Sequence, residues 1–82
     1  MTSSRHATTL RFSYASPAVA ERIAASVRPE SGAIEGDRTT ASLSREGDTV
    51  TVDVVASDLT ALRAGQNTWV TLLEVAERAG DT

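Results

Sequence analysis

Cysteine and lysine are both missing from this 82-residue chain. Without cysteine, the chain can form neither disulfide bonds nor a thiolate metal site. Its single histidine, His6, together with scattered carboxylates makes a poor ligand set for a metal ion. We therefore expect no metal and no cofactor.

Long apolar runs are missing as well. No run approaches the ~18 residues that a membrane-spanning helix requires, and residues 1–6 lack the apolar core of a signal peptide. We expect a cytoplasmic protein without membrane contact and a single domain over residues 1–82. A chain this short buries only about 60% of the surface that its unfolded form exposes, so association is a natural way to add buried area.

Positive charge is scarce. All eight basic residues are arginines, and eleven carboxylates give a net charge of −3. An acidic chain is a weak candidate for independent nucleic-acid binding, because nonspecific affinity comes from neutralising phosphates. An acidic, lysine-free composition fits adaptation to high salt. GC-rich codon usage also replaces lysine with arginine, and the two explanations are compatible.

The first half of the chain has the pattern of a strand and a helix. A two-residue period over residues 5–14 predicts a strand with one buried face. Ser16 and Pro17 favour a helix start, because serine caps free backbone N–H groups and proline is tolerated at the first helical position. The helix is expected to end near Arg28, and residues 30–37 to form a loop.

The second half has the pattern of a hairpin and a long helix. Residues 38–45 alternate weakly, as in a polar or edge strand, whereas residues 49–56 alternate clearly, with valines on one side. A glycine-containing turn joins the two strands. Asp58 is a suitable cap for a last helix over residues 59–79, which Gly80 would stop.

This order predicts an α+β fold with two layers, in which a β-α-β-β-α chain forms a three-stranded antiparallel sheet covered on one face by two helices. The final strand of a ferredoxin-like β-α-β-β-α-β sheet is lacking. Two sheet edges therefore stay open, and open edges are templates for pairing with another chain. A second copy related by a two-fold axis would supply such a pairing.

The last helix has a wider apolar arc than its own fold needs. The arc spans roughly 180°, whereas a helix that only covers a sheet needs about 100°. Its members are Leu59, Ala61, Leu62, Gln66, Trp69, Val70, Leu72, Leu73 and Ala76. We expect another polypeptide to cover the excess. Gly65 lies inside the arc, where close backbone packing is favoured over a merely tolerated glycine.

Residue patterns for catalysis are not found. The chain has no G-x-S-x-G, P-loop or G-x-G-x-x-G motif. Gly32 and Gly36 are spaced too widely for the G-x-x-G clamp of a KH domain. Glu35 and Asp37 lie on a loop without the apolar wall of a catalytic carboxylate pair. We expect that the chain is not an enzyme.

Residues 57–70, SDLTALRAGQNTWV, resemble the Pcc family. An acidic helix cap is followed by the core Arg63-Ala64-x-x-Asn67 and a hydroxyl residue. Leu-Arg-Phe, Ala-Ser-Pro and Val-Arg-Pro-Glu earlier in the sequence extend the resemblance, in order, over nearly the whole chain. Thr68 stands where serine is commoner, and Trp69 is bulkier than the aliphatic residue expected there.

The resemblance implies a small subunit of the KEOPS complex that forms homodimers in archaea, and the composition favours a haloarchaeal source. Through its helices, such a subunit binds the N-terminal helices of the Kae-type catalytic ATPase subunit, and through it the kinase-like subunit. The complex transfers a threonylcarbamoyl group to the adenosine next to the anticodon in tRNA. The small subunit is a non-catalytic scaffold that contacts tRNA indirectly or weakly.

The resemblance and the apolar arc together predict a partner and dimer interface. Its residues are Val19, Ile23, Leu62, Arg63, Gln66, Asn67, Trp69, Val70 and Leu73. Arg63 and Asn67 are carried over by their position in the family pattern, and they lie one helical turn apart on a polar ridge. We expect them to fix the dimer or the partner, with tRNA contact or a solvated face as alternatives. The apolar members also fit the chain's own core.

Two other function classes stay open. A stand-alone KH-like RNA-binding module needs a basic face, in contrast to the net charge of −3. A ferredoxin-like domain that binds a small regulatory molecule needs a final strand, and only Asp81 and Thr82 follow the last predicted helix. Salt-titrated RNA binding tests the first class, and thermal stabilisation by metabolites tests the second.

Overall fold

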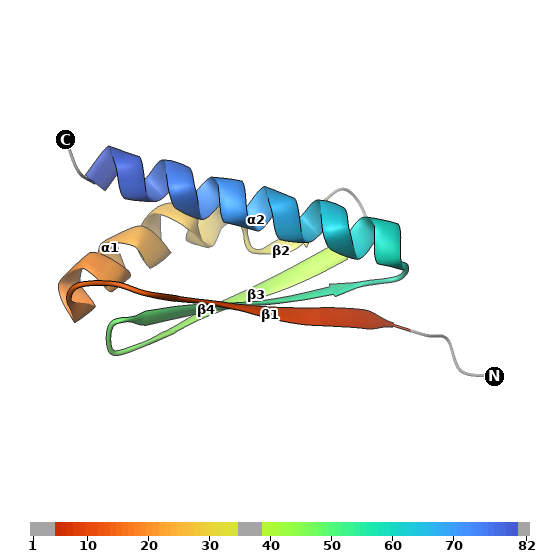
Figure 1. Ribbon diagram of the computed structural model, residues 1–82, viewed down its shortest axis with the longest axis horizontal. Helices are drawn as coiled ribbons and strands as arrows, with labels where there is room; N and C mark the ends of the chain where they lie inside the picture. The colour runs from red at the N-terminus through yellow and green to blue at the C-terminus, as the bar shows by residue number, and fades with distance from the viewer. Residues whose placement is uncertain (1–4, 35–38, 81–82) are drawn as a thin grey trace.

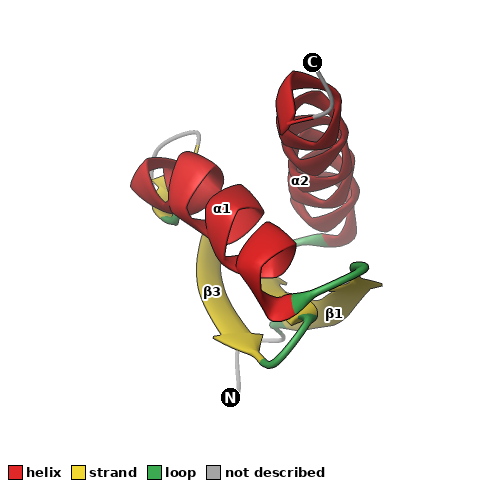
Figure 2. Cartoon of the chain, turned by 90° about the vertical axis from the view of Figure 1, so that its left-hand side faces the viewer, coloured by secondary structure: helices red, strands yellow, loops and turns green. Residues whose placement is uncertain are grey.

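Two helices lie on the same side of an antiparallel sheet (Figures 1 and 2). The computed structural model of the chain describes residues 5–34 and 39–80. Its elements are β1 His6–Ser13, α1 Pro17–Val27, the 3-10 turn Arg28–Glu30, β2 Gly32–Ile34, β3 Thr39–Glu46, β4 Thr49–Ala56 and α2 Leu59–Gly80. The predicted two-layer α+β fold is confirmed.

The three long strands of the sheet are those that the sequence predicts. The strand order is β1-β4-β3-β2, and β4 pairs along its whole length with β1 on one side and β3 on the other. Side chains of β4 alternate between the helix layer and the open face of the sheet. β1 is one edge of the sheet and the short β2 is the other.

The structure corrects the prediction in the middle of the chain. β2 pairs with β3 from Gly32–Ala41 to Ile34–Thr39, which adds a short fourth strand within the predicted loop 30–37. The first half of β3 is therefore an interior strand and not an edge. Burial explains this pairing, because the backbone groups of the buried Thr39 and Ala41 need hydrogen-bond partners, which the chain coming from α1 supplies. The rest of that loop, residues 35–38, lies outside the described residues.

The helix starts follow the predicted caps. Ser16 Oγ accepts a 3.2 Å hydrogen bond from the Val19 N–H, and Pro17 is the first residue of α1. Asp58 Oδ1 accepts a 2.8 Å hydrogen bond from the Ala61 N–H at the start of α2. α2 includes Gly80 instead of stopping before it, and its 22 residues span about 33 Å. Of the helices in the described ranges, none has both the length and the apolar character of a membrane span.

The core lies between the sheet and the helices. Val50, Val52 and Val54 of β4 are fully buried, and they share one hydrophobic cluster with Trp69 and Leu73 of α2. Because valine side chains are short, the space between the layers has to be filled from the helices, and the bulky indole of Trp69 fills much of it.

The predicted close approach at Gly65 is confirmed. A Cβ atom at Gly65 would lie 2.8 Å from Thr39 Cγ2 and 3.1 Å from Val54 Cγ1, so a side chain at this position would force the neighbouring side chains to shift. The middle of α2 is thereby held against β3 and β4.

Candidate functional site

Four of the predicted interface residues lie in the core of the single chain. Trp69 and Leu73 are fully buried, Ile23 is 3% exposed and Leu62 is 7% exposed. These side chains are not available to a partner in this fold, and we remove them from the predicted surface. Less of the predicted apolar arc is left for other chains than its width indicates, because the shallow valine layer of the sheet leaves room for large helix side chains.

The other five predicted residues reach the surface. Val19 on α1 is partly exposed. On α2, Gln66 and Val70 are partly exposed, and Arg63 and Asn67 are exposed. The four residues of α2 are spaced three or four positions apart or are direct neighbours, so they share one side of the helix. Val19 lies apart from them, on the other helix.

That side of α2 faces β1, and we name it the β1 flank. It consists of Leu59, Arg63, Gln66, Asn67 and Val70. Glu77 lies on the same side of the helix, and its contact shows that this side faces β1. Glu77 Oε2 accepts a 2.8 Å hydrogen bond from the hydroxyl of Tyr14, the residue directly after β1. Leu59 is 47% exposed, so the chain leaves apolar surface uncovered on this mixed polar and apolar flank.

A free strand edge lies beside the β1 flank. β1 pairs only with β4 in the part of the chain that the structure describes. The Tyr14 N–H donates to the Asp48 carbonyl at 2.9 Å, so the even-numbered residues of β1 direct their backbone groups toward β4. Backbone direction alternates along a strand, so the odd-numbered residues expose their N–H and C=O groups at the edge. These residues are Ala7, Thr9, Arg11 and Ser13.

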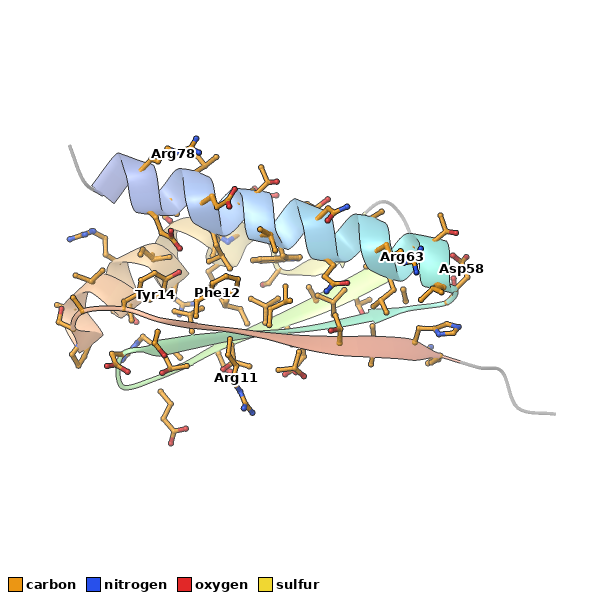
Figure 3. The ribbon with its side chains drawn as sticks, in the orientation of Figure 1. Arg11, Phe12, Tyr14, Asp58, Arg63 and Arg78 are labelled. Carbon is orange, nitrogen blue, oxygen red and sulfur yellow. The ribbon has the colours of Figure 1, made fainter. Side chains whose placement is uncertain are left out.

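Side chains of β1 alternate in the same way. Phe12 and Tyr14 point toward the helices, whereas Arg11 points away from them (Figure 3). Phe12 and Tyr14 are only partly buried. The edge therefore offers unpaired backbone groups together with incompletely covered aromatic side chains.

The opposite flank of α2 faces α1 across a shallow groove, which we name the interhelical groove. Two hollows of about 240 and 150 Å³ lie along it. The walls come from α1, the 3-10 turn that follows it and the second half of α2. They are formed by Arg22, Ser26, Val27, Glu30, Leu72, Val75, Ala76 and Ala79. Val75 is 54% exposed, so this flank also carries uncovered apolar surface.

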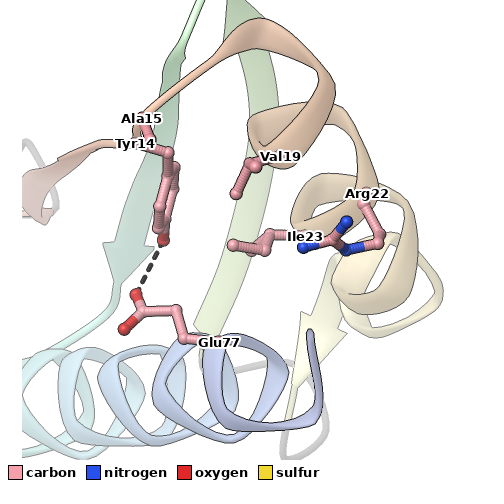
Figure 4. Close-up of a pocket in the computed structure, with 6 residues that line it drawn as sticks. All are labelled: Tyr14, Ala15, Val19, Arg22, Ile23 and Glu77. Carbon is pink, nitrogen blue, oxygen red and sulfur yellow. Dashed lines mark hydrogen bonds between the residues drawn. The ribbon is translucent and has the colours of Figure 1, made fainter. Parts of the chain in front are cut away.

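A third hollow, of about 310 Å³, lies between the end of β1, α1 and the end of α2 (Figure 4). We name it the Tyr14 pocket; it is lined by Tyr14, Ala15, Val19, Arg22, Ile23 and Glu77. Burial raises the pKa of Tyr14 above its ordinary value, and the hydrogen bond to Glu77 and the charge of that carboxylate raise it further. The phenol therefore stays protonated and donates to Glu77 throughout the neutral range.

The described residues hold no group of three or more His, Cys, Asp or Glu side chains placed to bind a metal ion. His6 lies at the start of β1, and Glu35 and Asp37 fall outside the described residues. The described surface offers a free strand edge, a helix flank of mixed polarity, a groove and the Tyr14 pocket with its hydrogen bond between Tyr14 and Glu77.

Comparison with known proteins identifies the family. A family model described as transcription factor Pcc1 matches residues 7–81, from β1 through α2. The chain belongs to the Pcc1 family. No curated protein matches the chain. The Pcc1 family is associated with the KEOPS complex, so the family predicted from the sequence is confirmed.

Some surface features of this Pcc1-family chain escaped the sequence prediction. Val75 lies just outside the predicted apolar arc. The sequence indicated its exposure only in that this valine shares its side of the helix with polar residues. The hydrogen bond between Tyr14 and Glu77 joins positions 63 residues apart, which no local pattern connects. Arg63 and Asn67, the polar pair predicted from the sequence, lie on the β1 flank and not in the interhelical groove.

Proposed function

We propose that this Pcc1-family chain is a non-catalytic dimerisation and scaffold subunit of the KEOPS complex in the cytoplasm. In that role it supports transfer of a threonylcarbamoyl group to the adenosine next to the anticodon in tRNA. The observation that carries the proposal is the family match over residues 7–81. The β1 flank and the interhelical groove add support, because a subunit that joins two other chains needs two uncovered surfaces.

The first surface receives a second copy of the chain at the β1 edge. A two-fold axis perpendicular to the sheet places the helices of both copies on one side. Directly opposed residues of an antiparallel pair point to the same side of the sheet, so even-numbered residues must face even-numbered ones. A register centred on Leu10 meets this condition, with Leu10 opposite its own symmetry mate and Phe12 opposite Thr8 of the second copy.

Charge favours this register over its neighbours. Centring on Arg11 would place two arginines directly opposite each other, which is destabilising. Centring on Thr9 would leave Arg11 opposite an alanine. With Leu10 on the axis, Arg11 lies beside Thr9 of the second copy, whose hydroxyl donates to Asp53 Oδ1 at 2.7 Å. Arg11 then shares a cross-strand row with the carboxylate of Asp53.

Arg63, Gln66, Asn67 and Val70 belong to the same proposed dimer interface. They lie on the flank of α2 above the β1 edge, where the symmetry-related helix would approach, and the exposed Leu59 would be covered there. Direct tRNA contact by Arg63 is the alternative. An Arg63→Ala protein that still dimerises, binds its partner and supports tRNA modification would end the assignment of this residue.

The second surface receives the catalytic subunit. We assign the interhelical groove to the N-terminal helices of the Kae-type ATPase subunit, because its walls are mostly apolar and come mainly from two helices. Val75 is 54% exposed there without any covering element among the described residues. The kinase-like subunit would be reached through the ATPase subunit, and tRNA indirectly or weakly.

The open face of the sheet does not favour the alternative of a stand-alone RNA-binding module. Serine and threonine dominate this face on the three long strands, and its charged side chains there are Arg11, Asp53 and Glu46. Two carboxylates against one guanidinium leave an acidic face, whereas phosphate binding needs clustered cations.

The proposal is tested in the source organism by deleting the gene and measuring threonylcarbamoyladenosine in digested tRNA by mass spectrometry. We expect the modification to fall and the wild-type gene to restore it. A Val75→Asp variant should dimerise but fail to co-purify with the catalytic subunit, because the charge lies in the groove. Exposed Thr71→Asp is the matched control and should co-purify. Unchanged modification after deletion, with no KEOPS subunit bound to the tagged chain, would overturn the proposal.

A further inference from the structure

The Tyr14 pocket holds a carboxylate in an electrostatically unfavourable position. Glu77 lies in the last turn of α2, where the helix dipole is negative and favours cations over anions. Within the described residues, the Tyr14 hydroxyl is its one hydrogen-bond partner, on Oε2, and no cation forms an ion pair with it. Oε1 remains for a further donor, and a positively charged one would relieve the repulsion from the helix end.

The other walls of the pocket suit a long side chain that carries a cation at its end. The Tyr14 ring and Glu77 lie on one side, and Val19 and Ile23 on the other (Figure 4). Aromatic rings attract cations above their faces, and aliphatic side chains cover methylene groups. A hollow of about 310 Å³ that opens at the surface is at the small end of binding sites, so it suits a side chain better than a cofactor.

We propose that the Tyr14 pocket binds an arginine side chain supplied by another protein. The guanidinium donates to Oε1 of Glu77 and lies against the Tyr14 ring, and its methylene stem packs on the partly exposed Val19. Arginine fits better than lysine, because a planar guanidinium can stack on the ring and donate to the carboxylate at the same time. The inference rests on the proposed function for the identity of the partner. The pocket adjoins the interhelical groove and shares Arg22 with it.

The charge of Arg22 distinguishes a bound cation from a bound carboxylate in this pocket. Its guanidinium lines the α1 side of the same pocket and repels a second cation. Removing it should therefore strengthen binding of an arginine side chain. If the pocket instead bound a carboxylate through Arg22, the same change would weaken binding.

The experiment uses the full chain with ¹⁵N labelling and two neutral-backbone probes, acetyl-arginine methylamide and acetyl-citrulline methylamide. Citrulline has nearly the same shape as arginine but no charge. We expect the arginine probe to shift the amide signals of Tyr14, Val19 and Glu77 in NMR spectra, and the citrulline probe to leave them in place. Glu77→Gln should weaken binding about tenfold, because it removes the charge and keeps an oxygen for the Tyr14 hydroxyl. Arg22→Ala should tighten binding.

Glu74→Gln is the matched control, because Glu74 is an exposed glutamate one turn earlier and lies outside the pocket. It should bind the probe as the wild type does, and circular dichroism checks that every variant is folded. Equal shifts with citrulline, or unchanged binding in Glu77→Gln, would overturn the pocket assignment. Tagged wild-type chain that co-purifies with KEOPS subunits while the probe fails would overturn only this inference. A probe that binds to a chain without KEOPS partners would instead count against the proposed function.

Discussion

At Gly65, the absence of a side chain sets the distance between α2 and the sheet. The atoms that a Cβ would meet belong to Thr39 and Val54, which are both buried and β-branched and so have little freedom to move. Glycine in a helix costs about 1 kcal/mol relative to alanine, and the close packing offsets that cost here.

We predict that Gly65→Ala destabilises the fold in spite of its better helix propensity. Overpacking a core costs about 1–3 kcal/mol, which exceeds a gain of about 1 kcal/mol in propensity. The free energy of unfolding is measured by urea denaturation with the fluorescence of Trp69, the single tryptophan. Exposed Thr71→Ala is the control and should change stability by less than about 0.5 kcal/mol. A more stable Gly65→Ala protein would contradict the packing at this position.

Tyr14 is the single tyrosine, so its ionisation can be followed directly by ultraviolet absorbance. We predict that the folded chain releases the phenolic proton at higher pH than unfolded chain does, because burial and then Glu77 raise the pKa of Tyr14 above its ordinary value of 10.0. Glu77→Gln should lower this pKa, since the neighbouring charge is gone.

The raised pKa of Tyr14 also makes the stability of the fold depend on pH. The folded state holds the phenolic proton more tightly than the unfolded state. The contribution of Tyr14 to stability is thus fully present below about pH 10 and is lost as pH rises through the folded pKa. A titration at the ordinary pKa in the folded protein would show that Tyr14 is neither buried nor hydrogen-bonded to Glu77 in solution.

Among the elements, β1 combines two kinds of backbone group. Even-numbered residues bond to β4, and odd-numbered residues face the free edge. Proline removes one N–H donor and is tolerated on edge strands where that N–H is unpaired within the fold. We therefore expect β1 to tolerate proline at odd-numbered positions and to lose its fold with proline at even-numbered positions.

We predict that Arg11→Pro leaves a folded monomer, whereas Leu10→Pro unfolds the chain. Arg11 exposes its N–H at the proposed dimer edge, and Leu10 uses its N–H within the sheet. Circular dichroism measures the fold, and sedimentation measures the mass. Arg11→Ala keeps the N–H group and should remain dimeric, which separates the loss of the donor from the loss of the charge. A dimeric Arg11→Pro protein would rule out pairing at this edge.

Over the whole molecule, the sequence was informative wherever a local pattern determined the structure. The two-residue period of residues 49–56 located β4, and the caps at Ser16 and Asp58 located both helix starts. β2 has three residues and no period of its own, so only its pairing with β3 reveals it.

The candidate surfaces were harder to predict than the fold. An apolar arc shows which helix side chains avoid water, but the depth of the opposite layer decides how many of them the chain itself can cover. The single chain buries Trp69 and Leu73 completely, yet it leaves Leu59 and Val75 about half exposed. The uncovered apolar surface of α2 therefore lies on its two flanks, whereas Trp69 and Leu73, which the sequence placed in an interface, lie in the core.

Pairing of two copies at the β1 edge would bring the same residue of both chains together, and the absence of cysteine allows an introduced disulfide to detect this contact. In the proposed register, Leu10 faces its symmetry mate as a non-hydrogen-bonded pair, with Cα atoms about 4.5 Å apart, within the range that a disulfide spans. Mild oxidation of a Leu10→Cys protein should give a covalent dimer on non-reducing gels. Ser13→Cys, far from the axis, should stay uncrosslinked. A Leu10→Cys protein that remains uncrosslinked, with a monomeric mass for the wild type by light scattering, would rule out pairing at the β1 edge.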